Sequence, residues 1–150
     1  MIAGASRIQT AAMLSQTAEY ALRAVLYLAA SATDHPVRVG EMAQALRIPR
    51  NYLSKILHLL ARTGVLVSAR GKLGGFQLAV APDHLAIMQV VAPFDRFDER
   101  RRCLLGRPQC SDGTACAAHT RWKDVAQRVT SFFIETTVAD LLQQDATVPV

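Results

Sequence analysis

The run from Gly40 to Val80 constrains the fold of this chain most strongly, because it joins two short helical patterns to a glycine-rich hairpin. Apolar residues at helical spacing predict a helix over residues 40–46 and a second helix that begins at Pro49 and ends before Gly64. Two residues separate these helices, so the pattern predicts a helix-turn-helix. An ordinary helical hairpin with a solvated outer face is the alternative.

The second of these helices has two dissimilar faces. Its apolar stripe consists of Leu53, Ile56, Leu57 and Leu60. The opposite face is polar and cationic, with Arg50, Asn51, Ser54, Lys55 and His58. In the major groove of DNA, Arg or Lys can read guanine and Asn can read adenine. We therefore expect four side chains to bind DNA: Arg50, Asn51, Ser54 and Lys55.

The segment that follows predicts a two-stranded wing. Residues 65–70 and 76–80 have the composition of strands, and the glycine-rich residues 71–75 form the tip between them. Arg70 and Lys72 are placed to hold backbone phosphates, which set register rather than sequence. The tip lacks the Lys-Ser/Thr ending of a nucleotide-binding loop. We expect a mainly α fold with a small β-hairpin wing, a winged helix-turn-helix.

The charge distribution agrees with a polyanionic partner for the first half of the chain. Residues 1–80 carry nine Lys or Arg against three Asp or Glu, a net charge of +6, whereas residues 81–150 have a net charge of −1. Fourteen of the seventeen cations are Arg, which suits bidentate contacts with phosphate and guanine. We therefore expect double-stranded DNA as a partner. The chain shows no nucleophile–base set, so we expect no enzyme activity.

Helical patterns also flank this region. They predict helices over residues 15–31, 82–91 and 117–136, with a short final helix over 137–142, and a short strand over 37–39. The helix after residue 117 carries large apolar side chains at near-heptad steps, which favours a dimer seam over packing against its own domain. That seam would contain Trp122, Val125, Val129, Phe132 and Phe133.

These elements divide the chain into a DNA-binding domain and a dimerisation arm. We expect a disordered extension over residues 1–12, with Met13 as a candidate start, and a winged domain over 13–92. A metal-binding loop over 93–119, a dimerisation region over 117–143 and a tail over 144–150 would follow. No apolar run is long enough to span a membrane, so we expect a cytoplasmic protein.

Every cysteine lies in the turn-rich stretch from Cys103 to His119, which also contains Cys110 and Cys116. A loop of this kind can bring three thiolates around one point. Three interpretations remain open: unconnected thiols, a structural zinc site with three Cys and one His, and an iron–sulfur cluster with one ligand other than Cys. The sequence favours the cluster. The odd number of cysteines argues against disulfides.

Four short segments match the signature of a known family: Tyr20-Ala-Leu-Arg-Ala-Val, Tyr52-Leu, Arg70-Gly-Lys-Leu-Gly-Gly-Phe and Cys116-Ala-Ala-His119-Thr-Arg-Trp122. With them, the chain resembles the Rrf2 (IscR/NsrR-type) family of bacterial winged-helix iron–sulfur transcription regulators over nearly all of residues 13–142. The resemblance implies a homodimer that binds palindrome-like operators, and a cluster whose state sets the affinity for DNA. Arg47 lies where the family often has Gly in the turn.

The resemblance also implies a ligand set. Cys103, Cys110 and Cys116 match the three cluster cysteines of the family. His119 matches the histidine of regulators that hold a 2Fe–2S cluster, and it is the favoured fourth ligand. Glu19 is its rival, because nitric-oxide and redox sensors of the family take an acidic ligand from the first helix of the partner subunit. A 2Fe–2S cluster is therefore favoured, with 4Fe–4S as the alternative.

Overall fold

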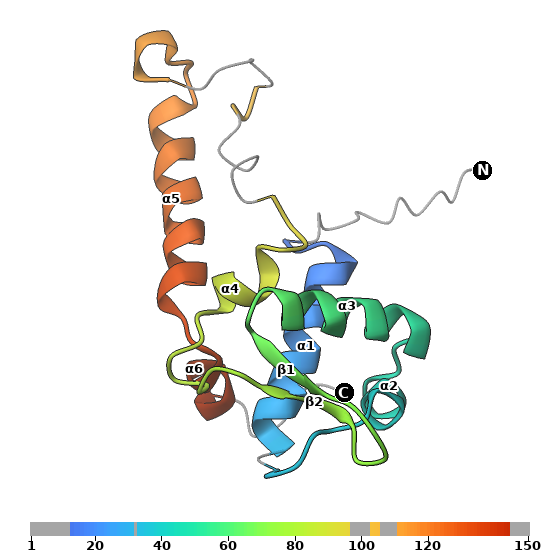
Figure 1. Cartoon of the computed structure of the whole chain (residues 1–150). Coiled ribbons are helices and arrows are strands. Elements are labelled where there is room, and N and C mark those ends of the chain that lie inside the picture. The colour runs from blue at the N-terminus through green and yellow to red at the C-terminus, as the bar shows by residue number, and fades with distance from the viewer. Residues whose placement is uncertain (1–12, 32, 97–102, 106–110, 145–150) are drawn as a thin grey trace, which may run out of the picture.

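A computed structural model of the chain describes residues 13–31, 33–96, 103–105 and 111–144. In these parts the elements are, in order, α1 (Gln16–Ser31), α2 (Val39–Leu46), α3 (Arg50–Arg62), β1 (Leu66–Ala69), β2 (Gly75–Leu78), α4 (Ile87–Val91), the 3₁₀ turn η2 (Asp112–Thr114), α5 (His119–Glu135) and α6 (Val138–Gln144). Figure 1 shows α1 to α4 and the hairpin gathered in one body, with α5 rising beside it as a long arm. The predicted fold class is confirmed.

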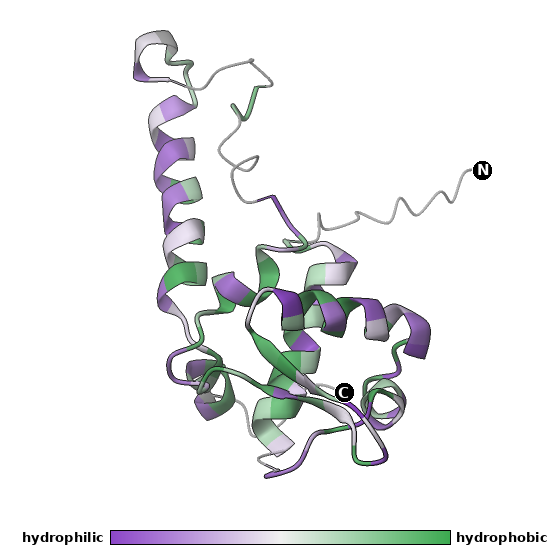
Figure 2. Ribbon diagram, viewed as in Figure 1, coloured by the Kyte–Doolittle hydropathy of each residue, from purple (hydrophilic) through white to green (hydrophobic). Residues whose placement is uncertain are grey.

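Small residues of α1 bring the other helices close together. Ala18, Ala21 and Ala24 are fully buried, and α1 packs against both α3 and α4. From the other side, the predicted stripe of α3 fills this core, with Leu53 and Leu57 fully buried. Figure 2 shows the resulting division, with apolar colour on the inner faces of these helices. Burial of this stripe fixes which face of α3 is turned to the outside.

The turn between α2 and α3 is a Schellman motif centred on Arg47. The N–H of Arg47 donates to the carbonyl of Gln44 at 3.3 Å, and that of Ile48 donates to the carbonyl of Ala43 at 3.0 Å. Arg47 takes the left-handed conformation, with φ of 54°, which Gly adopts more easily. Ile48 is buried beneath the turn. Arg47 thus occupies, with a full side chain, a backbone conformation that favours Gly.

The wing is an antiparallel hairpin in which Leu66 faces Leu78 and Ser68 faces Phe76. Phe76 also forms an isolated bridge with Val37, which replaces the strand expected over residues 37–39. A Cβ at Gly75 would lie 2.3 Å from the carbonyl oxygen of Val37, so only Gly permits this close approach. The bridge ties the base of the wing to the segment that precedes α2.

The prediction of a helix over residues 82–91 was too long, because α4 begins only at Ile87. The N–H of Val138 donates to the carbonyl of Leu85 at 2.9 Å, and Ala86 forms a bridge with Thr137. This extended pairing holds residues 85–86 out of helical geometry. The buried residues of α4 are Ile87, Val90 and Val91, whereas Met88 is half-buried.

The seam expected on α5 is divided in the structure. Phe133 is 4% exposed and belongs to the core of its own chain, which leaves it little surface for a dimer seam. Val129 is half-buried against the same core. Val125 and Phe132 are about half exposed, at 48% and 52%, and so is Ile134 at 55%. Sequence spacing could not separate these roles, because the pattern does not show that the core of the same chain covers α5 at Val129 and Phe133.

Candidate functional sites: a metal centre and a nucleic-acid interface

The polar face of α3 is turned outward as the sequence predicted. Arg50, Asn51 and Lys55 are exposed, and Ser54 is half-buried. Arg70 and Lys72 are exposed on the wing. The structure therefore presents the six predicted DNA-binding side chains on the helix-turn-helix and on the hairpin that follows it.

The wing tip is held by a residue that sequence analysis did not single out. The guanidinium Nη2 of Arg38, just before α2, donates to the backbone carbonyl of Lys72 at 2.7 Å. Gly71 at the tip has a φ of 97°, which allows the tight turn. Together these contacts fix the position of Lys72 relative to α2. Arg38 was recognised only as a contributor to net charge, and its contact depends on folding.

A second unpredicted contact joins α1 to α3. The hydroxyl groups of Thr17 and Tyr52 are hydrogen bonded, and the ring of Tyr52 packs edge-on against Tyr20, with 5.9 Å between centroids. Arg23 donates from Nη2 to the backbone carbonyl of Leu46 at 2.9 Å, and so provides a hydrogen-bond donor for the last carbonyl of α2. These contacts join the segments that contain Tyr20 and Tyr52 in the folded chain.

Two of the three cysteines are described, and they lie together. The Sγ atoms of Cys103 and Cys116 are 4.0 Å apart, with Cys103 buried and Cys116 half-buried. Two thiolates on one tetrahedral ion, with metal–sulfur bonds of about 2.3 Å, lie roughly 3.8 Å apart. A disulfide would need about 2.05 Å. The donor chemistry and spacing of this pair fit a soft metal centre, and Cys110 lies outside the described residues.

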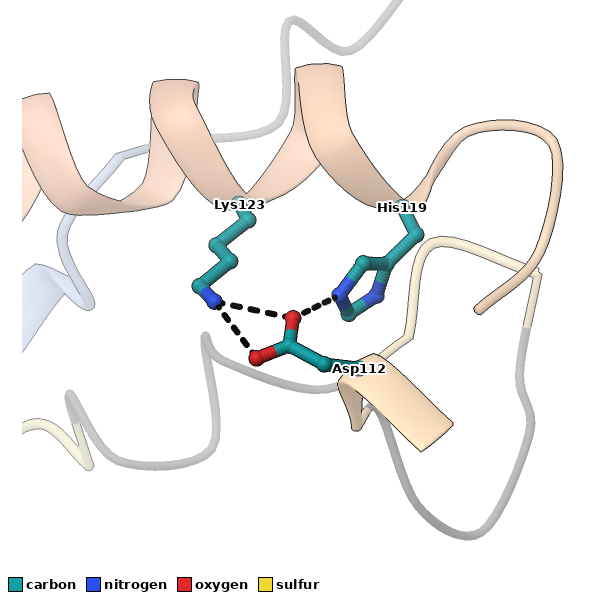
Figure 3. Close-up of polar contacts among 3 residues, drawn as sticks. All are labelled: Asp112, His119 and Lys123. Carbon is teal, nitrogen blue, oxygen red and sulfur yellow. Dashed lines mark hydrogen bonds and ion pairs between the residues drawn. The ribbon is translucent and has the colours of Figure 1, made fainter. Parts of the chain in front are cut away.

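His119 begins α5 directly after this pair. Its backbone N–H donates to the carbonyl of Cys116 at 2.9 Å, and its side chain is 8% exposed. The ring Nε2 lies 2.9 Å from Oδ1 of Asp112. Asp112 also accepts hydrogen bonds from Lys123, at 2.9 Å on Oδ1 and 3.1 Å on Oδ2 (Figure 3).

This contact sets the ionisation of Asp112. The hydrogen bond with His119, followed by the hydrogen bond and charge of Lys123, lowers the pKa of the Asp112 carboxyl below its usual value. These three side chains lie at an open groove of about 490 Å³ that runs along α5 past Trp122 to Ile134. Neither Asp112 nor Lys123 stood out in the sequence, because their pairing depends on how η2 folds against α5.

Glu19, the rival fourth ligand, lies on α1. Its carboxylate is 56% exposed and 3.9 Å from Arg23, one helical turn further along. Among the described side chains, no group of three or more His, Cys, Asp or Glu is assembled for a metal ion. The described residues thus bring together Cys103 and Cys116, with His119 adjoining Cys116 through its backbone, whereas Glu19 pairs with Arg23 on α1.

These features define a class of protein: a winged helix-turn-helix DNA-binding protein with a thiol and histidine centre at the start of its arm. Residues 14–144 match the Rrf2 family, described as iron-dependent transcriptional regulators, and the chain belongs to this family. The HTH-type transcriptional regulator IscR of Aliivibrio salmonicida is 30% identical over 129 residues, which cover 86% of this chain and 76% of that protein. The protein is therefore a transcription regulator.

Solved structures share its fold. IscR of T. potens has a TM-score of 0.69 at 20% identity, and the alignment covers 87% of this chain and 86% of the IscR chain. CymR, the global cysteine regulator of B. subtilis, has a TM-score of 0.70 at 21% identity, with 88% and 97% covered. Within the part of the chain that the structure describes, no helix has the length and apolar content needed to cross a bilayer.

Proposed function

We propose that this protein is a dimeric repressor whose affinity for operator DNA is set by an iron–sulfur cluster held by Cys103, Cys110, Cys116 and His119. The observation that carries the proposal is the 4.0 Å approach of the Cys103 and Cys116 sulfurs next to a buried histidine. The description of the matched family as iron-dependent transcriptional regulators supports an iron-containing centre. Because its partner is chromosomal DNA, its site of action would be the cytoplasm.

In this proposal α3 enters the major groove of a palindromic operator. Arg50 and Lys55 would bind guanine or phosphate, Asn51 would bind adenine, and Ser54 would bind either. Arg70 and Lys72 would hold the sugar-phosphate backbone from the wing. A two-fold dimer would place its two α3 helices about 34 Å apart, or a multiple of that distance.

The dimer would form along α5. Val125, Phe132 and Ile134 leave about half of their surfaces exposed on this arm. A helix with exposed apolar side chains gains free energy when a second copy covers them. Trp122 and Val129, both half-buried, would complete the seam at its edges.

The cluster would be the sensing element, with 2Fe–2S favoured over 4Fe–4S. When bound, it supplies a centre that exchanges an electron or is lost to oxidant, nitric oxide or iron shortage. The segment from Asp95 to Val138, which contains this loop and α5, is hydrogen bonded at both ends to the winged domain of residues 13–92 (the reading head). The backbone N–H of Ser15, at the start of α1, donates to Asp95 at 3.0 Å, and Thr136 and Val138 are bonded to Ile87 and Leu85. A change in loop order can therefore move α5 relative to α3.

A second candidate function is direct thiol sensing without a cluster, with or without zinc. The same 4.0 Å spacing favours it, because Cys103 and Cys116 are close enough to be joined after small movements. Two thiols would each lose a proton and together lose two electrons to a peroxide, which is reduced to water, while one S–S bond forms.

Anaerobic purification separates the two candidates. The cluster proposal predicts a coloured protein with stoichiometric iron and sulfide, bleached by air, and an operator affinity that differs between the two states. The variants Cys103→Ala and Cys116→Ala should lose the colour and this difference but keep the fold. A colourless protein without iron, whose DNA affinity responds to peroxide through the same cysteines, would overturn the cluster and support thiol sensing.

A further inference from the structure

The Asp112 side chain is exposed to solvent but forms a hydrogen bond with the buried side chain of His119. Its carboxylate is 79% exposed, yet it contacts a histidine side chain that is only 8% exposed. His119 and Lys123 are four residues apart on α5, so they project from the same face of the helix. Asp112 comes from η2, the segment between Cys110 and Cys116. The carboxylate thus links η2 to the first two turns of α5 (Figure 3).

The chemistry of the pair determines which ring nitrogen carries the proton. An ionised carboxylate only accepts hydrogen bonds, so Nε2 of His119 must be the donor to Oδ1 of Asp112. In the neutral imidazole the lone pair is then on Nδ1. Histidines that bind metals commonly donate their other ring N–H to a carboxylate in this way, which fixes tautomer and ring orientation.

We infer that Asp112 is a positioning residue for the metal centre, which holds His119 in the Nε2–H tautomer so that Nδ1 is the ligating atom. This inference rests on the proposed function in taking His119 as a ligand. Asp112 itself is not a ligand, because both of its oxygens accept hydrogen bonds from Lys123 and one also accepts from His119. Lys123 keeps the carboxylate against α5 when the rest of the loop changes.

In the opposite role, called a latch, the hydrogen bond to Asp112 would hold the His119 ring in an orientation that prevents metal binding. The two roles predict opposite effects of removing the carboxylate. If Asp112 positions the ligand, its loss weakens the hold on the cluster. If it is a latch, its loss strengthens that hold.

The first test needs no cluster. Nitrogen-15 NMR of the metal-free protein should show His119 as the Nε2–H tautomer in the wild type and in Asp112→Asn, whose amide oxygen still accepts. In Asp112→Ala the two tautomers should mix. The matched control is Asp124→Ala, because Asp124 lies on the same helix but pairs with Arg128 at 3.1 Å. An unchanged His119 tautomer in Asp112→Ala would overturn the inference.

The second test measures the cluster-loaded protein. Asp112→Ala should lose its cluster to a chelator about 10–100-fold faster than wild type, the usual effect of removing such a partner. Asp112→Asn should recover most of this loss. Both variants should have a higher reduction potential, because the negative charge near the centre is gone. Asp124→Ala should behave like wild type. Equal or slower cluster loss in Asp112→Ala would overturn the inference and, if slower, favour the latch.

A double variant shows whether Asp112 acts through His119. In a His119→Ala background, Asp112→Ala should have no further effect on cluster loss, and an additive effect would count against the inference. Its failure is distinguishable from failure of the proposed function. A protein that binds a cluster but ignores Asp112 refutes only the positioning role. A protein with the Nε2–H tautomer that never takes up iron refutes the cluster instead.

Discussion

At the scale of single residues, the C-terminal ends of α2 and α3 can be compared, because both end in the same backbone motif. The end of α3 repeats the motif that ends α2: Gly64 donates to the carbonyl of Ala61 at 3.3 Å, and Val65 donates to that of Leu60 at 3.0 Å. Gly64 has a φ of 82°. The same backbone geometry is therefore formed by Gly64 at one helix end and by Arg47 at the other. Of these two residues, only Arg47 has a Cβ atom, so only Arg47 has the steric cost of the left-handed conformation.

We predict that Arg47→Gly stabilises the protein. The left-handed conformation costs an ordinary residue about 1–2 kcal/mol, and the larger backbone entropy of unfolded Gly takes back about 0.5–1 kcal/mol. The free energy of unfolding should rise by about 0.5–1 kcal/mol, measured by urea denaturation. The reciprocal control, Gly64→Ala, has open space around the new Cβ, so it should lose about 1 kcal/mol from φ alone. Loss of stability in Arg47→Gly would contradict the strain.

Residue roles were predictable from sequence only where a local pattern carries them. The apolar stripe of α3 repeats at helical spacing, so the outward position of Arg50 followed from the position of Leu53 and Leu57. Asp112 has no such pattern, because its partners lie seven and eleven residues away and meet it only after η2 folds back. Contacts of this kind depend on tertiary structure.

At the scale of elements, neighbouring residues on α5 have opposite environments. Phe133 is 4% exposed and Phe132 is 52% exposed, although their rings pack edge-on with 5.4 Å between centroids. The sequence predicted a single seam because both residues fit a heptad step. Among the described residues, α5 packs against the core of its own chain near its end, where it meets α4, and His119 is buried at its start. Periodicity identifies the apolar residues of a helix but not which partner covers them.

We predict that the two phenylalanines separate folding from dimerisation. Phe133→Ala should lower the free energy of unfolding by about 3 kcal/mol, because it removes a buried aromatic side chain from the core. Phe132→Ala should change it by less than about 0.5 kcal/mol, as measured on the dissociated chain. The same variant should raise the dimer dissociation constant about tenfold, measured by analytical ultracentrifugation. If Phe132→Ala leaves that constant unchanged, the seam lies elsewhere.

The α5–α6 joint is stabilised by a reciprocal cap. The side chain of Asp140 accepts from both the backbone N–H and the hydroxyl of Thr137, each at 2.8 Å, and Thr137 accepts from the N–H of Asp140 at 3.2 Å. These bonds lower the pKa of Asp140, with the backbone N–H as the larger cause. Thr137 also forms the bridge with Ala86, so the cap supports the attachment of the arm to the reading head.

We predict that this cap makes stability depend on pH. Because the folded pKa of Asp140 is lowered, its contribution is complete above about pH 4 and is lost as the pH falls through the folded pKa. Asp140→Asn should therefore have a lower free energy of unfolding than wild type at neutral pH. This difference in free energy should shrink as the pH falls toward about 3. Urea unfolding across this range measures it. Asp34→Asn, at an exposed turn position, is the control, and a pH-independent difference for Asp140→Asn would refute the cap.

At the scale of the whole molecule, the fold and its division into head and arm were predictable, whereas the joints between them were not. The helix-turn-helix and the wing depend on contacts close in sequence, α2 with α3 and β1 with β2, and each has a local signal. The joints depend on pairs far apart in the chain: Ser15 with Asp95, and Leu85 with Val138. These same joints carry the proposed coupling from the metal loop to DNA.

The DNA-binding arrangement predicts a specific dependence on salt. In a dimer, Lys72→Ala removes one wing cation from each of two subunits. Each lost phosphate contact makes the slope of log K against log salt shallower by about 0.9, so the slope for the dimer should become shallower by about 1.8.

The control, Arg62→Ala, removes the same charge from the far end of α3, roughly 18 Å from Arg50 along the helix axis. Its slope should change far less. Fluorescence anisotropy with an operator duplex between about 50 and 200 mM salt measures both slopes. Equal slopes for the two variants would show that net charge, rather than a docked wing, holds the DNA.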